Sequence, residues 1–373
     1  MIFDSHVYCF TAPDAPAGHA SGAAHLEFWQ RQYALHHQPT FRVRDRALGN
    51  AHLLLDPTAC DPLRLASNRN FRVDRTCNRL IWTVDGDDYT KQQLPPNVIE
   101  FSPGAMVAEM DHAGVDIGLI HADATLTKDV AFLAMCVAAF PDRLRAMAPL
   151  DEWLIPEKPD LAIAQAVTAI NEHRLHALKI IPAYAYQQTN SRSFNEPAWG
   201  PFWDAVVTLD VPVFFTLGSR PGAKDQRQGF IDEVWELRRL MDRHPSLRAS
   251  VTHGYPWRAF LDGNRLTVPT NIWAPFRDTS LMLEVGFPFR LGDVFDFPYA
   301  ECRPVLEEMV QHIGPDRLIW GSDMPFQNRF CTYRQSRDYI EKHSASFLSA
   351  PNLAKIMGGN VARLLRLDFA ARV

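Results

Sequence analysis

The segment LIWGSDMPF, residues 318–326, joins a short apolar run to an ionisable side chain. Its first three residues predict a buried strand, and Gly321-Ser322 ends that strand just before Asp323. A carboxylate at the end of a buried strand is costly unless it has polar partners. In parallel α/β proteins this end of the strand carries the active-site loops, so Asp323 is a candidate functional residue. Capping of the following turn is the alternative.

Apolar strands alternate with helical patterns over most of the rest of the chain. Strands are expected at residues 1–7, 115–121, 144–150, 177–182, 213–217, 249–253, 280–286 and 318–321. Helices are expected at residues 104–112, 128–140, 161–173, 201–209, 230–243, 268–276, 303–313 and 353–365. This alternation implies a parallel sheet, and eight units predict an α/β protein with a closed (β/α)8 TIM barrel.

Residues 11–100 interrupt this rhythm. They contain one helical stripe at 25–35 and a predicted hairpin whose strands, 80–84 and 89–94, flank Asp85-Gly86. We therefore predict a single barrel domain over residues 1–373, with 11–100 inserted after the first strand as a cap or an oligomerisation segment. Trp29 and Trp82, expected to be exposed on this arm, favour a homodimer.

Composition narrows the class of protein. The 373 residues are 47% hydrophobic and 22% charged, with a net charge of -5, so neither nucleic acid nor an anionic membrane is an expected partner. The start MIFDSHVYCF lacks a basic n-region, and no run reaches the roughly 18 apolar residues of a membrane span. The six cysteines, Cys60 among them, form no CxxC pair. We expect a cytoplasmic protein with reduced thiols that acts on a small molecule.

Polar side chains recur where the predicted strands end. These side chains are His6, Tyr8, His121, Asp123, Lys179, Thr216, His253, Glu284 and Asp323. On the first strand Asp4, His6 and Tyr8 alternate and are expected to point the same way. The carboxyl ends of barrel strands converge, so this set could hold a metal, run acid–base chemistry, or do both. Any single one, such as His121, is alternatively a packed and hydrogen-bonded residue.

The chain resembles the amidohydrolase-related branch of the amidohydrolase superfamily. The resemblance rests on FDSHVY, EMDHAGVDIGLI, FPDRL, ALKIIP, VTHGYP, GPDRLIWGSDMP and IMGGNVARLL, and it spans residues 1–7 and 102–367. That branch includes hydrolases, lactonases and non-oxidative aromatic acid decarboxylases, so the resemblance implies an enzyme on a TIM barrel.

Two departures from the pattern of this branch bear on metal binding. The first strand usually carries Asp/Glu-x-His-x-His, but Tyr8 replaces the second histidine, and Thr216 stands where strand five usually ends in a histidine. Catalytic zinc normally needs three protein ligands and a water. We therefore expect no tightly bound metal. The alternative is zinc or manganese held by His6, His253 and Asp323.

The resemblance and these departures together predict a hydrolase. Asp323 would activate water as a general base and His253 and His6 would polarise a carbonyl group. The expected substrate is a small, cyclic or aromatic, carboxylated lactone or activated ester or amide. Its expected contacts are Tyr8 and Thr216 as hydrogen-bond donors, Lys179 at the developing oxyanion, and His121 and Glu284.

Two alternatives to the hydrolase remain open at the level of sequence. The first is a lyase that decarboxylates a phenolic or unsaturated carboxylic acid, and the second is a relative that binds a ligand without turnover. In the hydrolase interpretation, Arg72 or Arg75 of the insertion could hold a substrate carboxylate by a bidentate contact.

Overall fold

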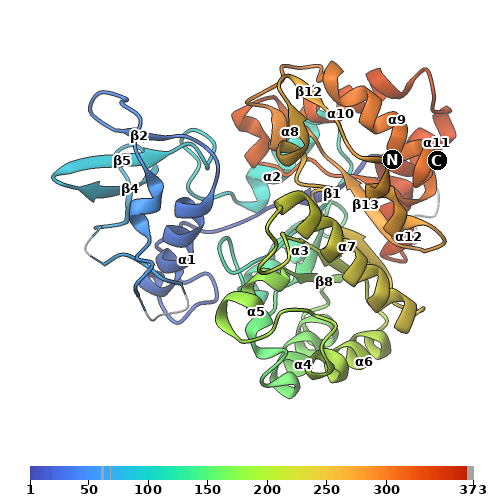
Figure 1. The fold of residues 1–373 in the computed structure, drawn as a ribbon, viewed down its shortest axis with the longest axis horizontal. Helices are drawn as coiled ribbons and strands as arrows, with labels where there is room; N and C mark the ends of the chain where they lie inside the picture. The colour runs from blue at the N-terminus through green and yellow to red at the C-terminus, as the bar shows by residue number, and fades with distance from the viewer. Residues whose placement is uncertain (60–62, 68, 368–373) are drawn as a thin grey trace.

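The chain folds around one barrel of eight parallel strands, shown as a computed structural model in Figure 1, which describes residues 1–59, 63–67 and 69–367. The strand order is β1-β6-β7-β8-β9-β10-β13-β14. Their bounds are β1 Phe3–Val7, β6 Ile117–Ile120, β7 Leu144–Ala148, β8 Ala177–Ile180, β9 Val213–Phe215, β10 Ala249–Val251, β13 Met282–Val285 and β14 Leu318–Trp320. The predicted TIM barrel is confirmed.

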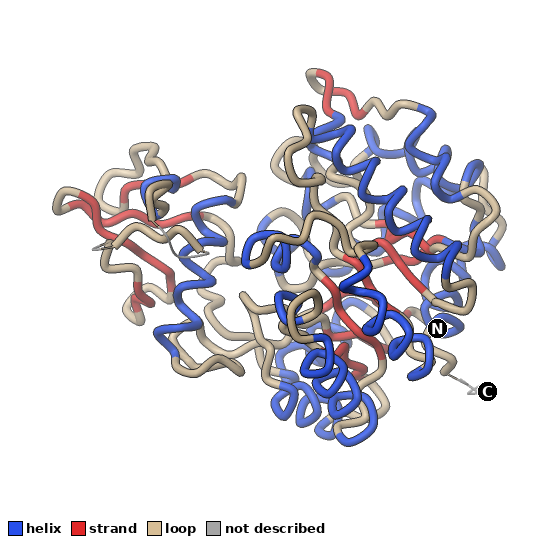
Figure 2. Tube along the Cα trace, turned by 60° about the horizontal axis from the view of Figure 1, so that its bottom comes forward, coloured by secondary structure: helices blue, strands red, loops and turns tan. Residues whose placement is uncertain are grey.

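Helices cover the outside of this barrel (Figures 1 and 2). The main ones are α2 Pro103–Ala113, α3 Val130–Ala139, α4 Pro159–Val167, α6 Gly200–Leu209, α7 Gln226–Arg243, α9 Arg303–His312 and α10 Tyr333–Ser344. Two expected helices differ. The one at 268–276 is a 3-10 segment, Thr270–Phe276, because Pro275 lies inside it. The closing helix is divided into α11 Ala350–Ala354 and α12 Asn360–Leu364, since Gly358 between them leaves helical geometry.

The barrel closes where β1 meets the loop that follows β14. The Tyr8 amide donates to the Met324 carbonyl at 2.8 Å, and the Asp323 amide donates to the His6 carbonyl at 2.9 Å. These two bonds continue the parallel pairing past the end of β14, and they fix Asp323 beside His6.

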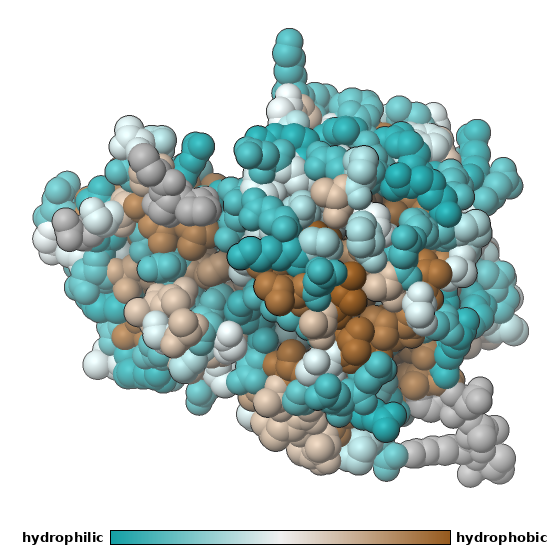
Figure 3. Space-filling model, turned by 90° about the horizontal axis from the view of Figure 1, so that it is seen from below, coloured by the Kyte–Doolittle hydropathy of each residue, from teal (hydrophilic) through white to brown (hydrophobic). Residues whose placement is uncertain are grey.

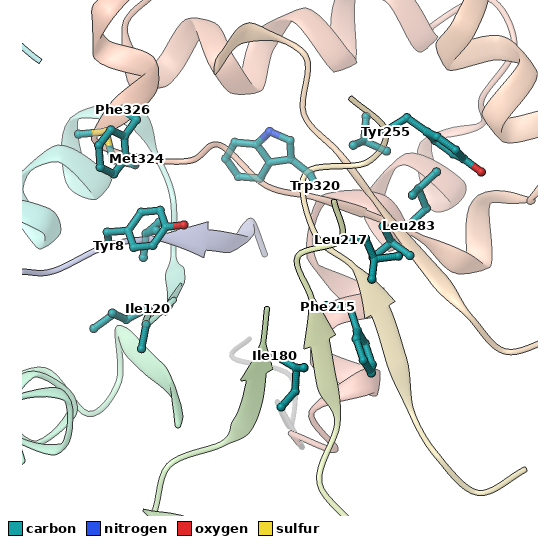
Figure 4. Packing of buried hydrophobic residues seen from close by; sticks show 14 of the residues in the cluster. Tyr8, Ile120, Ile180, Phe215, Leu217, Tyr255, Leu283, Trp320, Met324 and Phe326 are labelled. Carbon is teal, nitrogen blue, oxygen red and sulfur yellow. The ribbon is translucent and has the colours of Figure 1, made fainter. Parts of the chain in front are cut away.

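The inside of the barrel is apolar below and polar above. One cluster of buried residues fills the lower layer, with Phe3, Leu119, Met147, Ala177, Phe214, Met282 and Ile319 contributed by successive strands. Four polar residues each come two positions after one of these apolar residues: His121 after Leu119, Lys179 after Ala177, Thr216 after Phe214 and Glu284 after Met282. Because side chains alternate along a strand, each polar residue lies above its apolar partner at the carboxyl end. Ile180, Phe215 and Leu283, on the intervening positions, belong to the larger core outside the strands (Figure 4).

Strand β1 departs from this alternation. Its register with β6 shifts between Asp4 and Val7, so Asp4 and His6 do not share a direction, and the expectation that they would is wrong. Asp4 instead accepts hydrogen bonds from the Ser322 amide at 3.0 Å and the Tyr333 hydroxyl at 2.7 Å. Burial raises the pKa of Asp4 to about 7. Asp4 therefore ties β1 to the β14 loop and lies outside the candidate site.

The insertion forms a lobe beside the barrel (Figures 1 and 2). It contains helix α1, Gly22–Leu35, and a four-stranded antiparallel sheet. The sheet order is β2 Thr40–Arg42, β5 Asp87–Lys91, β4 Arg79–Val84 and β3 Arg72–Asp74, and β4 with β5 confirms the predicted hairpin.

Two expectations about the insertion are wrong. Trp29 and Trp82 are fully buried, because both pack against Tyr33 in the core of the lobe, so they do not support a dimer, which stays a prediction. Arg72 pairs with Asp88 and Arg75 with Asp14 near the surface of the lobe, so neither is available to hold a substrate.

The surface is largely hydrophilic in the view of Figure 3, with apolar side chains gathered over the middle of the barrel lobe. Within the described part of the chain, no helix has the length and apolar character needed to cross a bilayer. Cys9, Cys77, Cys136, Cys302 and Cys331 are free thiols, as expected, and Cys60 lies outside the described residues. The cytoplasmic location stays a prediction.

Candidate active site

A cavity of about 270 Å³ opens at the carboxyl ends of the strands. The barrel contributes Tyr8, Asp123, Thr216, His253, Arg290, Asp323 and Arg329 to its lining, and the insertion contributes Trp29, Gln32, His36, His37 and Gln93. Tyr184, Phe289 and Phe326 add aromatic surface suited to a flat ring. The insertion therefore forms one wall of the cavity, as a cap would.

Asp323 meets two imidazoles at this cavity. Its Oδ1 lies 3.4 Å from Nε2 of His6 and 3.5 Å from Nε2 of His253. Burial raises the pKa of Asp323 to about 6, against the opposing effect of His6 and Arg290. The expected convergence of these three residues is observed. A carboxyl group with such a pKa exists in both protonation states near neutral pH, which suits acid or base chemistry.

The backbone at His253 and Asp323 is held in an unusual conformation. Their φ angles are +69° and +65°, in the left-handed region that non-glycine residues rarely adopt. Hydrogen bonds hold both: the His253 amide donates to Glu284 at 3.1 Å, and the Asp323 amide donates to His6. Backbone strain of this kind costs of order 1–3 kcal/mol per residue and clusters at functional sites, which supports a functional role for both residues.

His6 is buried behind Tyr8 and does not line the cavity. Its Nδ1 pairs with Glu284 at 2.9 Å and its Nε2 with the Tyr8 hydroxyl at 2.8 Å. Burial lowers the pKa of His6 to about 3, so the ring is neutral. Gly321 makes room for this arrangement, because a Cβ there would lie 2.7 Å from Glu284 and 2.8 Å from His6. His6 thus orients Tyr8, which lines the cavity.

Lys179 and His121 form a second buried hydrogen-bonded pair, beside that of His6 and Glu284. Lys179 Nζ donates to His121 Nδ1 at 2.9 Å, and His121 Nε2 donates to the Ser5 carbonyl at 2.8 Å. Burial lowers the pKa of Lys179 to about 8. Together with Glu284, these residues are buried and do not line the cavity. The prediction that His121, Lys179 and Glu284 contact the substrate directly is therefore corrected: they support the residues that line the cavity.

Thr216 lines the cavity as expected, and its buried hydroxyl has no hydrogen-bond partner. Asp123 also lines the cavity, but its carboxylate already accepts from the amides of Thr125 and Leu126 at 2.8 and 2.9 Å. A buried hydroxyl without a partner is costly, so Thr216 is the freer of the two to bind a ligand.

Sequence reasoning missed Arg290 and Arg329. Arg290 Nη2 donates to His253 Nδ1 at 3.1 Å, and its buried Nε has no partner. Arg329 donates to the Phe326 carbonyl at 2.8 Å. Among the described residues, neither guanidinium has a carboxylate oxygen within 4.0 Å. The available signal was position: Arg290 lies in the segment after β13 and Arg329 in the segment after β14, at the carboxyl ends of barrel strands.

Two groups of donors lie close enough together to hold a metal ion. They are His6, His121 and Glu284, and His6, His253 and Asp323, with ligand atoms within 4.8 Å of one another. In the second group the Oδ1–Nε2 separations of 3.4 and 3.5 Å suit a tetrahedral ion. The hydrogen bonds made by His253, however, do not suit a metal ion. Arg290 can only donate, so the neutral His253 ring carries its proton on Nε2, the atom that would have to bind the ion.

His6 adds to this mismatch. Its Nε2 is occupied by the Tyr8 hydroxyl, and its ring lies nearly parallel to that of His253, with centroids 4.5 Å apart and planes inclined by 20°. A ring nitrogen binds a metal in the plane of its ring, so two stacked rings do not readily share one ion. The residues present therefore do not fit a tightly bound divalent metal in this arrangement.

Comparison with known proteins places the chain among amidohydrolase-type barrels. The gamma-resorcylate decarboxylase of Polaromonas sp. JS666 is 24% identical over 288 residues, which cover 66% of this chain and 79% of that protein. The structure of a dihydroxybenzoic acid decarboxylase from Polaromonas sp. JS666, with bound manganese and 2-nitroresorcinol, has a TM-score of 0.53 at 21% identity. The match covers 73% of this chain and 88% of that one.

A second solved structure is equally similar in fold. It is a probable 2-pyrone-4,6-dicarboxylic acid hydrolase from Acinetobacter baumannii with citric acid bound, with a TM-score of 0.53 at 14% identity. The match covers 72% of this chain and 90% of that one. At these identities the two structures support the fold alone. The model of the amidohydrolase family, however, matches residues 23–367, which is most of the chain. This protein is therefore a member of the amidohydrolase family.

Proposed function

We propose that this protein catalyses the non-oxidative decarboxylation of a small hydroxylated aromatic or unsaturated cyclic carboxylic acid. The observation that carries the proposal is a protonatable carboxyl group, Asp323, in one cavity with a guanidinium, Arg290, that has no carboxylate partner among the described residues. The similarity to gamma-resorcylate decarboxylase supports this reaction over hydrolysis, which the sequence alone ranked first.

The reaction needs an anchor for the carboxylate and an acid for the ring. Arg290, which lines the cavity, binds the substrate carboxylate through its guanidinium N–H groups, and the aromatic lining holds the ring. Protonated Asp323 transfers its proton to the ring carbon that carries the carboxylate. The bond to the carboxylate then breaks, its electron pair returns to the ring, and carbon dioxide leaves. Asp323 regains a proton from water.

Tyr8 and Thr216 serve the substrate hydroxyl group. The Tyr8 oxygen is fixed by His6 at 2.8 Å, and the Thr216 hydroxyl has no hydrogen-bond partner among the residues that the structure describes. A hydroxyl group on the ring raises the electron density at the carbon to be protonated, so contacts that orient it assist the step. Each polar group then acts at a separate point on the substrate: carboxylate, reacting carbon and hydroxyl.

We propose that the reaction proceeds without a bound metal. The proton on His253 Nε2 and the partners of His6 leave Asp323 without two free imidazole ligands beside it. The charge that a metal would supply at the carboxylate is supplied by Arg290, with Lys179 beneath the cavity floor.

Metal analysis tests this part of the proposal. Protein purified without added metal and dialysed against EDTA is expected to contain well below one manganese or zinc per chain and to keep its kcat. The measurement is elemental analysis alongside a turnover assay before and after dialysis. Activity that disappears with EDTA and returns with manganese would overturn the proposal.

Hydrolysis is the second candidate, because the same geometry supports a base. An ionised Asp323 could take a proton from water that attacks a lactone, with the His253 Nε2–H donating to the carbonyl oxygen. The similarity in fold to the probable pyrone dicarboxylic acid hydrolase is consistent with this. The two reactions differ in the form of Asp323 that they require.

The pH dependence of kcat/KM separates the two reactions. The pKa of Asp323 is raised to about 6, so its acid form predominates below about pH 6 and its ionised form above. For decarboxylation, kcat/KM is expected to level off below about pH 6 and to fall about tenfold per pH unit above it. For hydrolysis it would instead rise through pH 6 to a plateau. Initial rates from pH 4.5 to 8.5 measure this.

The function itself is tested by product analysis. Purified protein is incubated with a panel of hydroxybenzoic acids and, in parallel, a panel of lactones, and products are identified by mass spectrometry. Release of carbon dioxide with replacement of a carboxyl group by hydrogen supports the proposal. Addition of water to a lactone with no decarboxylation in the first panel would contradict it.

A further inference from the structure

The cavity holds more positive charge than one carboxylate requires. Arg290 and Arg329 both line it, and each lowers the pKa of nearby histidines His36 and His37, which places both arginines close to the insertion wall. The positive charge of Arg290 also helps to lower the pKa of Arg329 to about 10, although burial is the main cause. Two like charges in one partly buried site repel each other unless an anion lies between or beside them.

The nearby carboxylates do not neutralise these arginines. Asp293 pairs with Arg258 at the rim, and Asp123 accepts two backbone amides. The charge of Asp323 raises the pKa of both arginines, but its carboxylate contacts the imidazoles of His6 and His253 and forms no ion pair with either guanidinium. In the proposed reaction Asp323 is moreover protonated, which leaves both guanidinium groups without a counter-charge. One substrate carboxylate accounts for Arg290 only.

Arg329 lines the cavity next to the insertion. It is the last residue of η9, Phe326–Arg329, and its Nη1 lies 3.4 Å from the carbonyl of Gln92 in the insertion. The next residue, Gln93, lines the cavity and is 4% exposed, yet its amide oxygen has no hydrogen-bond partner. A half-turn of that amide presents an N–H donor instead. A buried amide oxygen without a donor is costly, and the turned amide avoids this cost because its N–H can donate to an anionic ligand.

We infer that Arg329 and Gln93, with His36 beside them, form a second anion subsite, so that the substrate is a small ring carrying two carboxylates. The inference rests on the proposed function for the identity of the reacting carboxylate, which Arg290 holds. Arg329 binds the second, unreactive carboxylate, and the insertion supplies the remaining donors. The insertion thereby acts as a specificity-determining cap, selecting dianions over monoanions.

Equilibrium binding tests this inference without any turnover. The probes are benzoate and benzene-1,3-dicarboxylate, titrated calorimetrically at fixed ionic strength into the full-length protein. Wild type is expected to bind the dicarboxylate at least about tenfold more tightly, as one further charge-assisted contact implies. Arg329→Met should remove this preference while leaving benzoate affinity within about twofold. Arg290→Met should weaken both probes.

Two further variants complete the test. Arg334→Met removes an arginine that is 61% exposed and pairs with Asp338 outside the cavity, and it should keep the full preference for the dicarboxylate. Gln93→Leu should reduce that preference about threefold without removing a charge. The inference is wrong if wild type binds both probes equally or not at all, or if Arg329→Met keeps the preference. Failure of decarboxylation with an intact binding preference would overturn the proposed function alone.

Discussion

Replacement of Asp323 by Asn is expected to lower kcat/KM at least about a thousandfold. Asparagine is similar in size but cannot donate a proton to carbon or take one from water, so both candidate reactions lose their proton-transfer group. The loss should appear mainly in kcat, because Arg290 and the aromatic lining still bind the substrate. Steady-state kinetics at pH 6, where the wild-type acid is half protonated, is the measurement.

The fold should survive this replacement. Asparagine tolerates the left-handed φ of +65° at position 323, and the amide that pairs with His6 is unchanged. The melting temperature should therefore stay within a few degrees of wild type. Asp316→Asn, at an exposed carboxylate paired with Lys355, is the matched control and should keep full activity. Near-normal kcat in the Asp323→Asn variant would show that another group transfers the proton.

Replacement of Arg290 by Met is expected to raise KM about a hundredfold. The methionine keeps the apolar stem against Phe289 but removes the charged donor that holds the substrate carboxylate. The carboxylate loses its negative charge as carbon dioxide forms, so Arg290 stabilises the bound substrate more than the transition state. Loss of Arg290 should accordingly act on KM, with kcat equal to or above the wild-type value.

A matched control separates charge at the carboxylate from charge near the cavity. Arg258→Met removes a neighbouring arginine that is paired with Asp293, so its expected change in KM is a few-fold at most. Arg290→Lys should recover only part of the affinity, because an ammonium group cannot reproduce both the bond to His253 and the contact with the substrate. An Arg290→Met enzyme with wild-type KM would place the carboxylate elsewhere.

Much of the architecture could be predicted from the sequence because its signals are local. Apolar strands separated by helical patterns indicate a barrel wherever they occur, and the alternation of side chains places His121, Lys179, Thr216 and Glu284 on its inner face. The segment that ends at Asp323 predicted a carboxylate at the top of the last strand. The structure places it beside two imidazoles, as expected.

The positions of the misplaced residues were decided by packing in the lobe and by strand register, which a sequence does not show. Trp29 and Trp82 look like an exposed interface in a sequence, but whether an aromatic is buried depends on what the rest of the lobe packs against it. Asp4 left the predicted inward face because a register shift in β1 changes which residues point inward.

By itself, the sequence determined the barrel, the position of the insertion and the ring of polar residues at the strand ends, since these follow from periodicity along the chain. Only the tertiary structure decided which of them reach the cavity, that Arg290 and Arg329 join them, and which nitrogen of His253 carries the proton. These properties depend on distances between residues far apart in sequence. Burial and hydrogen bonding across those distances set charge and protonation, and no local pattern encodes them.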